Sequence, residues 1–215
     1  LFLACELFSA ASYVLVGYLR GDPHSSEAAI KYFLYSAAFS GLTLYGLSWF
    51  YGLTGSTDLY EVAAALRDSE AALRPIALPA LILVTAGLVS KIAAVPFHQW
   101  MPDACEGSSP PAVAFLAVVP TLAGFAGLTR VLLTALPAGV GGLFVDWRTL
   151  LIALAAITMV AGNLIALWQE NAKRLLAYLS IAQAGYLLIG IAAASPQGAA
   201  AALFSLAAYA LSSLG

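Results

Sequence analysis

Two charged residues, Glu6 and Lys91, stand in stretches of sequence that are otherwise apolar, and both side chains can exchange protons. Apolar residues flank Glu6, and a charged side chain at the centre of a membrane helix costs about 2.5–3.5 kcal/mol on insertion scales. In a helix, Ser9 and Tyr13 share the face of Glu6, and their hydroxyls can hold water or bond to the carboxylate. We therefore expect the Glu6 carboxylate to transfer protons. The alternative is that Glu6 lies near a helix end and its side chain only extends to the membrane–water interface.

Lys91 follows an uncharged run of 16 residues at 75–90 and precedes Pro96 by five residues. A buried lysine is switchable, because desolvation favours its neutral form whereas a nearby carboxylate favours the ammonium. We expect Lys91 to take up and release protons. The alternative is a static ion pair with Glu6 that only locks two helices together, and the two roles can coexist.

Three further kinds of charged residue could take part in proton transfer. His98 lies in the polar break at 96–102, and an imidazole with a reference pKa of about 6.5 suits proton relay near neutral pH, although a lone histidine can equally be a packed, hydrogen-bonded residue. Lys31 opens the second apolar run, where it is either a residue for proton uptake or an ordinary interfacial lysine. Asp103 and Glu106 are interpreted as solvated turn or capping residues that could line an entrance.

The composition indicates lipid, rather than water, as the medium of most of the surface. Apolar residues make up 62% and charged residues 9% of the chain, with a mean hydropathy of +0.91, whereas ordinary chains carry about a quarter charged residues. The net charge of -2 leaves no basic patch for nucleic acid. The two cysteines form no CxxC motif, and the sequence has no metal-ligand spacing, phosphate-binding glycine loop or activated nucleophile. No metal or cofactor is expected in this chain.

The apolar runs predict an all-α polytopic membrane protein with about seven transmembrane helices in a single membrane domain over residues 1–215. About 20 apolar residues in a helix cross a hydrocarbon core about 30 Å thick. The predicted spans are 1–19, 31–52, 75–106, 110–135, 148–168, 174–194 and 198–215, with a short surface helix in the polar stretch 53–74. Residues 1–19 lack the features of a signal peptide, and both chain ends lie in apolar runs, so we interpret the chain as a fragment of a longer protein.

The third span must be broken near Pro96. In a continuous helix Pro96 could not donate a hydrogen bond to Ile92, and its ring would clash with the carbonyl of that residue. Lipid cannot satisfy free backbone groups, so a break at membrane depth is tolerated only inside the protein or beside a water-filled cavity. The break is therefore expected to place Lys91 and His98 beside such a cavity.

Several short motifs carry a resemblance to a known family. They occur in the order Lys31-Tyr-Phe-Leu, Gly52-Leu-Thr-Gly-Ser-Thr-Asp58-Leu, Lys91-Ile-Ala-Ala-Val-Pro-Phe-His-Gln-Trp100, Pro102-Asp, Glu106-Gly and Lys173-Arg-Leu-Leu-Ala-Tyr178. With them the chain resembles, over essentially its whole length, the subunit N family of NADH-quinone oxidoreductase, the antiporter-like subunits in the membrane arm of respiratory complex I. The resemblance implies a fragment of an antiporter-like fold of about fourteen helices.

The same resemblance implies proton translocation, in which Glu6 and Lys91 form a pair that opens and closes as quinone reduction elsewhere drives the cycle. His98 would transfer protons with them, and Lys31 would be a residue for proton uptake. The chain would be a non-redox subunit of a proton-pumping translocase, with NADH, flavin, iron–sulfur clusters and quinone bound in partner subunits. Those partners would be other membrane-arm subunits in a bacterial inner membrane.

One departure from the family pattern bears on this interpretation. The family usually has a lysine after the proline of the next helix, where this chain has Pro120-Thr121, so Thr121 would replace an ionisable relay residue. This leaves open a structural scaffold subunit with an impaired proton channel. A further alternative is a subunit of a multisubunit cation/proton antiporter, which shares the helix architecture, although the Gly-Ser-Thr-Asp motif at 55–58 favours subunit N.

Overall fold

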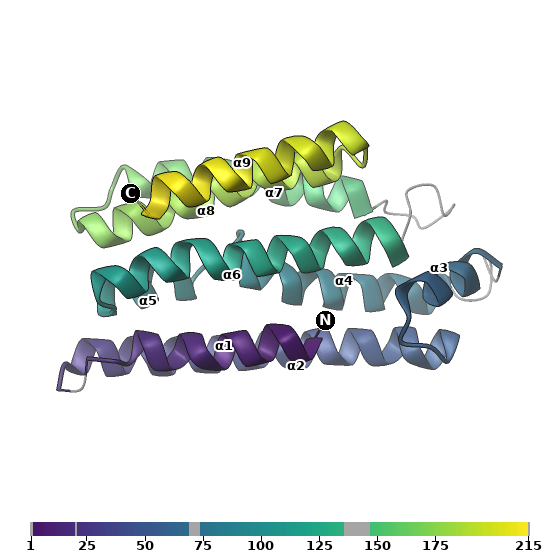
Figure 1. The fold of residues 1–215 in the computed structure, drawn as a ribbon, viewed down its shortest axis with the longest axis horizontal. Helices are drawn as coiled ribbons and strands as arrows, with labels where there is room; N and C mark the ends of the chain where they lie inside the picture. Colours follow the sequence, from purple (N-terminus) through teal and green to yellow (C-terminus); the bar gives the residue numbers. More distant parts are fainter. Residues whose placement is uncertain (1, 20, 69–73, 136–146, 215) are drawn as a thin grey trace.

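Residues 2–19, 21–68, 74–135 and 147–214 are described by the computed structural model, and all their regular elements are helices. In chain order these are α1 (Phe2–Val16), α2 (Pro23–Thr54), α3 (Leu59–Asp68), α4 (Arg74–Lys91), α5 (Trp100–Gly107), α6 (Pro110–Arg130), the π-helical turn η1 (Val131–Ala135), α7 (Trp147–Ala166), α8 (Ala172–Ala192) and α9 (Pro196–Leu214). The long helices run along one common direction, with α1 and α2 on one side, α4 to α6 in the middle and α7 to α9 on the other side (Figure 1). Over the described residues, the predicted all-α fold is confirmed.

The membrane spans follow from helix length and composition. Within the described residues, three helices are long and apolar enough to cross a membrane, namely 110–135, 147–166 and 172–192, while 2–16 and 77–91 are shorter apolar helices. The predicted number of about seven spans and their exact limits stay predictions. The connection at 136–146 lies outside the described residues.

The second helix begins earlier than the sequence interpretation placed it. The second predicted span is 31–52, whereas α2 begins at Pro23 and is 32 residues long. Asp22 is its N-cap, with a carboxylate that accepts a hydrogen bond from the backbone N–H of His24 at 3.0 Å, and proline is favoured in the first helical position. The Asp22-Pro23 pair is therefore a helix start.

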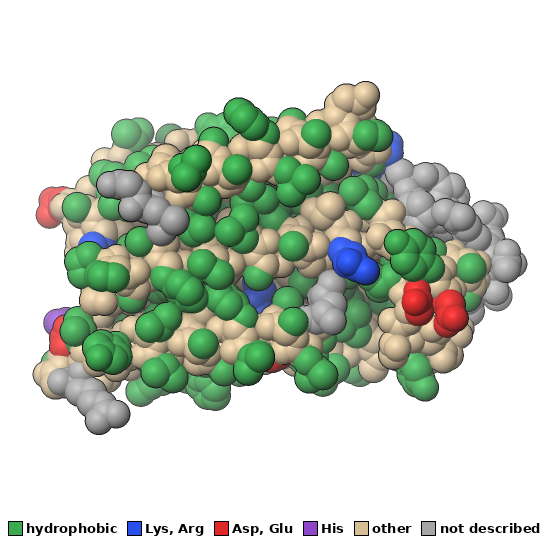
Figure 2. All heavy atoms as spheres, viewed as in Figure 1, with side chains coloured by type: hydrophobic (Ala, Val, Ile, Leu, Met, Phe, Trp, Pro, Cys, Tyr) green, Lys and Arg blue, Asp and Glu red, His purple; other side chains and the backbone are tan. Residues whose placement is uncertain are grey.

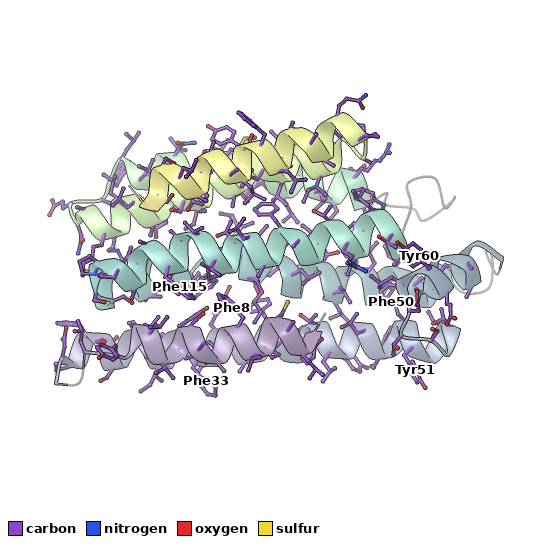
Figure 3. All side chains as sticks on the ribbon, in the orientation of Figure 1. Phe8, Phe33, Phe50, Tyr51, Tyr60 and Phe115 are labelled. Atoms are coloured by element: carbon purple, nitrogen blue, oxygen red, sulfur yellow. The ribbon has the colours of Figure 1, made fainter. Side chains whose placement is uncertain are left out.

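Close helix packing depends on aromatic and small residues. Phe8 of α1 stacks on Phe115 of α6 with ring centroids 5.7 Å apart, and the two rings face each other between these helices (Figure 3). Between α7 and α8, a Cβ on Gly162 would lie 2.8 Å from the backbone nitrogen of Ala182. Because membrane helices associate largely through such close backbone approach, any side chain at Gly162 would separate α7 from α8.

Large apolar side chains remain on the outer surface of the helices. Hydrophobic side chains are spread across the whole face shown in Figure 2. Examples in α1 and α9 are Leu3, Leu7, Phe204 and Leu211, each at least 77% exposed. A water-soluble protein rarely exposes contiguous apolar area of this kind, and the chain is accordingly a multi-pass integral membrane protein.

Candidate proton-transfer site

The site is built around the end of α4, where the helix stops at Lys91. The N–H of Ala94 donates to the carbonyl of Val89 at 3.3 Å, and the N–H of Ala93 donates to the carbonyl of Ser90 at 3.1 Å. These two bonds form a Schellman motif, in which the residue at the position of Ala93 adopts the left-handed conformation, here with φ 54°. The helix therefore ends five residues before Pro96, in agreement with the predicted break near this proline.

The first part of the break, residues 92–95, is buried inside the protein, whereas Pro96 and Gln99 are exposed. Val95 is buried and its N–H donates to Thr158 Oγ1 of α7 at 3.0 Å, immediately before the cis peptide bond to Pro96. The indole N–H of Trp100 donates to the carbonyl of Ser90 at 2.8 Å. Side chains of other helices thus satisfy backbone groups that lipid could not, which is the condition for a break at membrane depth.

Four side-chain oxygens from two helices surround the ammonium group of Lys91. Its Nζ lies 3.2 Å from Oε1 of Glu6 and 2.8 Å from Oγ of Ser9, both on α1. From α2, Oγ of Ser36 is 3.1 Å away and Oγ of Ser40 is 3.3 Å away. We call these four residues the Lys91 cradle. The structure therefore brings together the two charges, Glu6 and Lys91, that were selected from the sequence.

The cradle gives the Lys91 ammonium an opposite charge and hydrogen-bond acceptors. The Lys91 side chain is only 13% exposed, so the ammonium needs partners in the protein, and Glu6 supplies the opposite charge. Two unit charges 4 Å apart attract by about 4 kcal/mol at an effective dielectric constant of 20. Lys91 is also the last residue of α4, where the helix dipole favours a cation.

Helix α6 packs directly on the end of α4 beside the cradle. A Cβ on Gly124 would lie 3.3 Å from Cβ of Lys91 and 3.4 Å from the backbone nitrogen of Ile92, so only glycine allows this approach. Thr121 lies one turn earlier on α6 and is 6% exposed. Its hydroxyl donates to the carbonyl of Ala117 in the same helix at 2.8 Å. Thr121 is thus buried next to the site and bonded within its own helix.

His98 and Lys31 are not in the cradle. The ring of His98 lies near Tyr178, with centroids 6.2 Å apart, and its Nδ1 is buried without a partner among the described residues. Lys31 is half exposed at the end of the bundle. Within the described part of the chain, no hydrogen bond or ion pair connects either residue to Lys91. Their roles in proton transfer stay predictions.

Lys31 instead belongs to a network of charges at the surface. Its ammonium pairs with Glu27 at 2.7 Å and with Asp103 at 3.3 Å, while Arg174 pairs with Asp103 at 2.9 Å and with Glu106 at 2.7 Å. The hydrogen bond from Lys31 lowers the pKa of the exposed Glu27 carboxyl below its usual value. Asp103 and Glu106 are partly exposed, as the interpretation of solvated residues predicts, but they lie within α5 and pair with cations of α2 and α8.

Sequence reasoning missed Ser36 and Ser40. Serine carries little hydropathy signal, and each residue was hidden in an apolar run. The available signal was their spacing of four residues, which puts both on one face of α2 together with Tyr32 and Thr43. All four side chains are buried. In the part of the chain that the structure describes, no group of three or more His, Cys, Asp or Glu residues could hold a metal ion.

Comparison with known proteins shows the family of the chain. The family described as "NADH:quinone oxidoreductase/Mrp antiporter, TM" matches residues 1–215. The chain is 45% identical over 218 residues to NADH-quinone oxidoreductase subunit N 2 of Chloroherpeton thalassium, covering 100% of this chain and 42% of that protein. The chain therefore spans less than half of this relative's length.

Two solved structures show a similar fold. A chain of respiratory complex I from Thermus thermophilus with bound aureothin superposes with a TM-score of 0.78 at 36% identity, covering 99% of this chain and 44% of that chain. A chain of the membrane-bound sulfane sulfur reductase, an archaeal respiratory membrane complex, superposes with a TM-score of 0.87 at 26% identity, covering 99% and 42%.

Proposed function

The chain belongs to the NADH:quinone oxidoreductase/Mrp antiporter transmembrane family, and we propose that it translocates protons as a membrane-arm subunit of an NADH:quinone oxidoreductase. The observation that carries this proposal is the contact of Lys91 with Glu6 inside the cradle, next to the buried first residues of a helix break. A buried, paired lysine at such a break is suited to bind and release a proton rather than to hold a fixed charge.

The proposed chemistry is a change in the proton affinity of one amine. While Glu6 lies beside Lys91, the carboxylate stabilises the ammonium. When the carboxylate moves away, the ammonium stays in a poorly hydrated site with hydroxyl groups alone, and its N–H bond breaks as the proton passes to an oxygen acceptor.

The energy for this cycle would come from partner subunits. Relatives of this chain are named as subunits of quinone oxidoreductases, so quinone reduction in another subunit would drive the movement of Glu6. NADH, flavin and iron–sulfur clusters would be bound by those partners, and this chain would take part in the enzyme without carrying electrons. Contacts with other membrane-arm subunits would transmit the movement.

A scaffold role is the second candidate, and Thr121 is the observation that favours it. The Thr121 hydroxyl is bonded to its own helix, and a hydroxyl cannot hold the charge of a relay lysine.

The antiporter alternative is less favoured, because the curated relatives with 45% identity are quinone oxidoreductase subunits. Co-purification with flavin-containing subunits, rather than with antiporter subunits alone, separates these two assemblies.

The decisive experiment is Lys91→Ala in the full-length subunit, with proton translocation measured per NADH oxidised in vesicles. We expect an assembled complex that oxidises NADH but moves fewer protons. The control is Thr43→Val, which removes a buried hydroxyl of α2 that donates only to the carbonyl of Phe39 in its own helix. Normal translocation in the Lys91→Ala complex would overturn the proposed function, and the scaffold role would be the remaining candidate.

A further inference from the structure

The Glu6 carboxylate accepts hydrogen bonds from two side chains, at clearly different distances. Oγ of Ser40, on α2, donates to Oε1 of Glu6 at 2.6 Å, and Nζ of Lys91 donates to the same oxygen at 3.2 Å. A hydroxyl typically donates to a carboxylate at about 2.5–2.7 Å and an ammonium at about 2.7–2.9 Å. The bond from Ser40 therefore has the length of a strong hydrogen bond to a charged group, whereas the bond from Lys91 is longer than usual. Ser40 is thus the closer partner of Glu6.

Ser40 also contacts the other charge of the pair. Its oxygen accepts a hydrogen bond from Lys91 at 3.3 Å. A hydroxyl has one proton to donate and two lone pairs to accept with, so Ser40 can donate to the carboxylate and accept from the ammonium at the same time. Ser9 and Ser36 accept from Lys91 as well. Within the described part of the chain, however, no hydrogen bond joins either of these two serines to Glu6, so Ser40 alone among the cradle serines bridges the two charges.

The packing of the helices gives α2 this bridging position. Helix α2 packs against both α1 and α4, while α1 and α4 have little packing with each other over the residues that the structure describes. Ser40 is buried on α2, with 7% of its surface exposed. The Glu6 side chain is 30% exposed, so its carboxylate has space to turn away from the lysine. A donor on α2 is therefore what keeps the carboxylate beside Lys91.

The Ser40 hydroxyl has a second acceptor within reach when the carboxylate moves away. A helical serine commonly donates to the carbonyl four residues earlier, as Ser9 and Ser180 do in this chain. For Ser40 that carbonyl belongs to Ser36, and a rotation of the side chain exchanges one acceptor for the other. A buried donor without an acceptor would be costly. Because Ser40 has this alternative, Glu6 can leave without creating such a donor.

We propose that Ser40 is a positioning residue, whose hydroxyl holds the Glu6 carboxylate beside Lys91 in the paired state and turns to its own helix in the unpaired state. The proposal rests on the proposed function, in which pairing with Glu6 controls the proton affinity of Lys91. The O–H bond of Ser40 stays intact in both states, so Ser40 transfers no proton itself. Its effect is to raise the fraction of carboxylates that are paired with the lysine.

The test compares Ser40→Ala with Ser36→Ala in the full-length subunit within its assembled complex. Both variants remove one acceptor of the Lys91 ammonium from α2, but only Ser40→Ala also removes a donor to Glu6. A hydrogen bond to a charged group shifts an equilibrium by about tenfold or more. We therefore expect proton translocation per NADH oxidised to fall by about tenfold in Ser40→Ala and by clearly less in Ser36→Ala.

Two conservative variants separate the hydrogen bond of Ser40 from its packing. Ser40→Thr keeps the hydroxyl and should restore much of the rate. Ser40→Cys keeps nearly the same size and shape, but a thiol is only a weak donor, so this variant should be almost as slow as Ser40→Ala. If the Ser40→Ala complex does not assemble, Ser40→Cys, which exchanges a single heavy atom, decides the question.

A double-variant cycle tests whether Ser40 acts through the carboxylate. In a Glu6→Gln complex the charge that Ser40 holds is already absent. Adding Ser40→Ala to that complex should therefore lower the rate by about twofold or less, because the two residues act as one unit. If Ser40 acted independently of Glu6, the decreases of the two single variants would multiply.

Four outcomes would overturn the positioning role: a decrease in Ser36→Ala as large as in Ser40→Ala, a normal rate in Ser40→Cys, no recovery in an assembled Ser40→Thr complex, or multiplied decreases in the double variant. Lys91→Ala in the same assay distinguishes the two levels of the proposal. Loss of translocation in Lys91→Ala together with normal rates in Ser40→Ala rejects only the role of Ser40. Normal rates in Lys91→Ala reject the proposed function itself.

Discussion

The ammonium nitrogen of Lys91 and the hydroxyl of Ser40 both donate to Oε1 of Glu6, at 3.2 and 2.6 Å. One carboxylate oxygen therefore receives a charged and a neutral hydrogen bond from two different helices, α4 and α2. Hydrogen bonds to a charged group are about twice as strong as those between neutral groups. The charge of Glu6 is thus the common element that holds α1 to both of its neighbours at this depth.

Glu6→Gln tests the importance of that charge. The amide keeps the shape and an oxygen acceptor but removes the negative charge next to a poorly exposed ammonium, so we expect proton translocation to fall by about tenfold or more, since the lost attraction is about 4 kcal/mol. Glu27→Gln makes the same chemical change in an exposed ion pair with Lys31 and is the control. Equal translocation by the two variants, measured per NADH oxidised, would contradict a catalytic Glu6.

Gly124→Ala tests the contact between α6 and the end of α4. The added methyl would press on Lys91 and Ile92, and overpacking of this kind costs about 1–3 kcal/mol. We expect lower thermal stability of the subunit and slower translocation. Gly41→Ala is the matched control, because a Cβ there meets nothing within 4 Å. The prediction fails if both variants melt at the temperature of the unchanged complex.

Ala93→Gly tests the cap that ends α4. Ala93 has a φ of 54°, a conformation that costs an L-residue about 1–2 kcal/mol and costs glycine almost nothing. We therefore expect higher thermal stability with unchanged translocation. The neighbouring Ala94→Gly change, at an ordinary φ, should instead lower stability by about 0.5–1 kcal/mol. A destabilised Ala93→Gly variant would show that the methyl group of Ala93 has a packing role that outweighs its backbone strain.

Asp103→Asn tests the surface network. Asp103 pairs with Lys31 of α2 and Arg174 of α8, but its side chain is one-third exposed, and exposed pairs contribute about 1 kcal/mol or less. We expect a small loss of thermal stability at low salt that disappears at about 1 M salt, where screening acts within about 3 Å. The control is Glu170→Gln in the exposed connection between α7 and α8. A loss that persists at high salt would indicate a packing role for Asp103.

The sequence was most informative at positions where placing a residue in the lipid bilayer costs free energy. Glu6 and Lys91 could be selected because no residue of opposite charge stands near either of them in the sequence. Pro96 identified the break because proline has no backbone N–H and cannot continue a helix. Their distance could not be predicted, because 85 residues separate the two in the chain. It follows from the packing of α2 against both α1 and α4.

The features that the sequence did not predict have a common physical cause, because the same residue types are compatible with two different local structures. Asp22-Pro23 fits a turn as well as a helix start, and only the hydrogen bond to His24 distinguishes them. Serines in an apolar run can bond to their own helix or to a neighbour, so Ser36 and Ser40 gave no clear signal. Ion pairs between α5 and α8 depend on partners about 70 residues apart in the chain.

The hydrogen bond from Val95 to Thr158 ties the break to α7. The indole N–H of Trp100 donates to the carbonyl of Ser90. These two hydrogen bonds fix the backbone on both sides of Lys91. Helix α1, which carries Glu6, lies at the edge of the bundle (Figure 1). In the proposed cycle, the alternation between paired and unpaired states would therefore be a movement of α1, while Lys91 keeps its position.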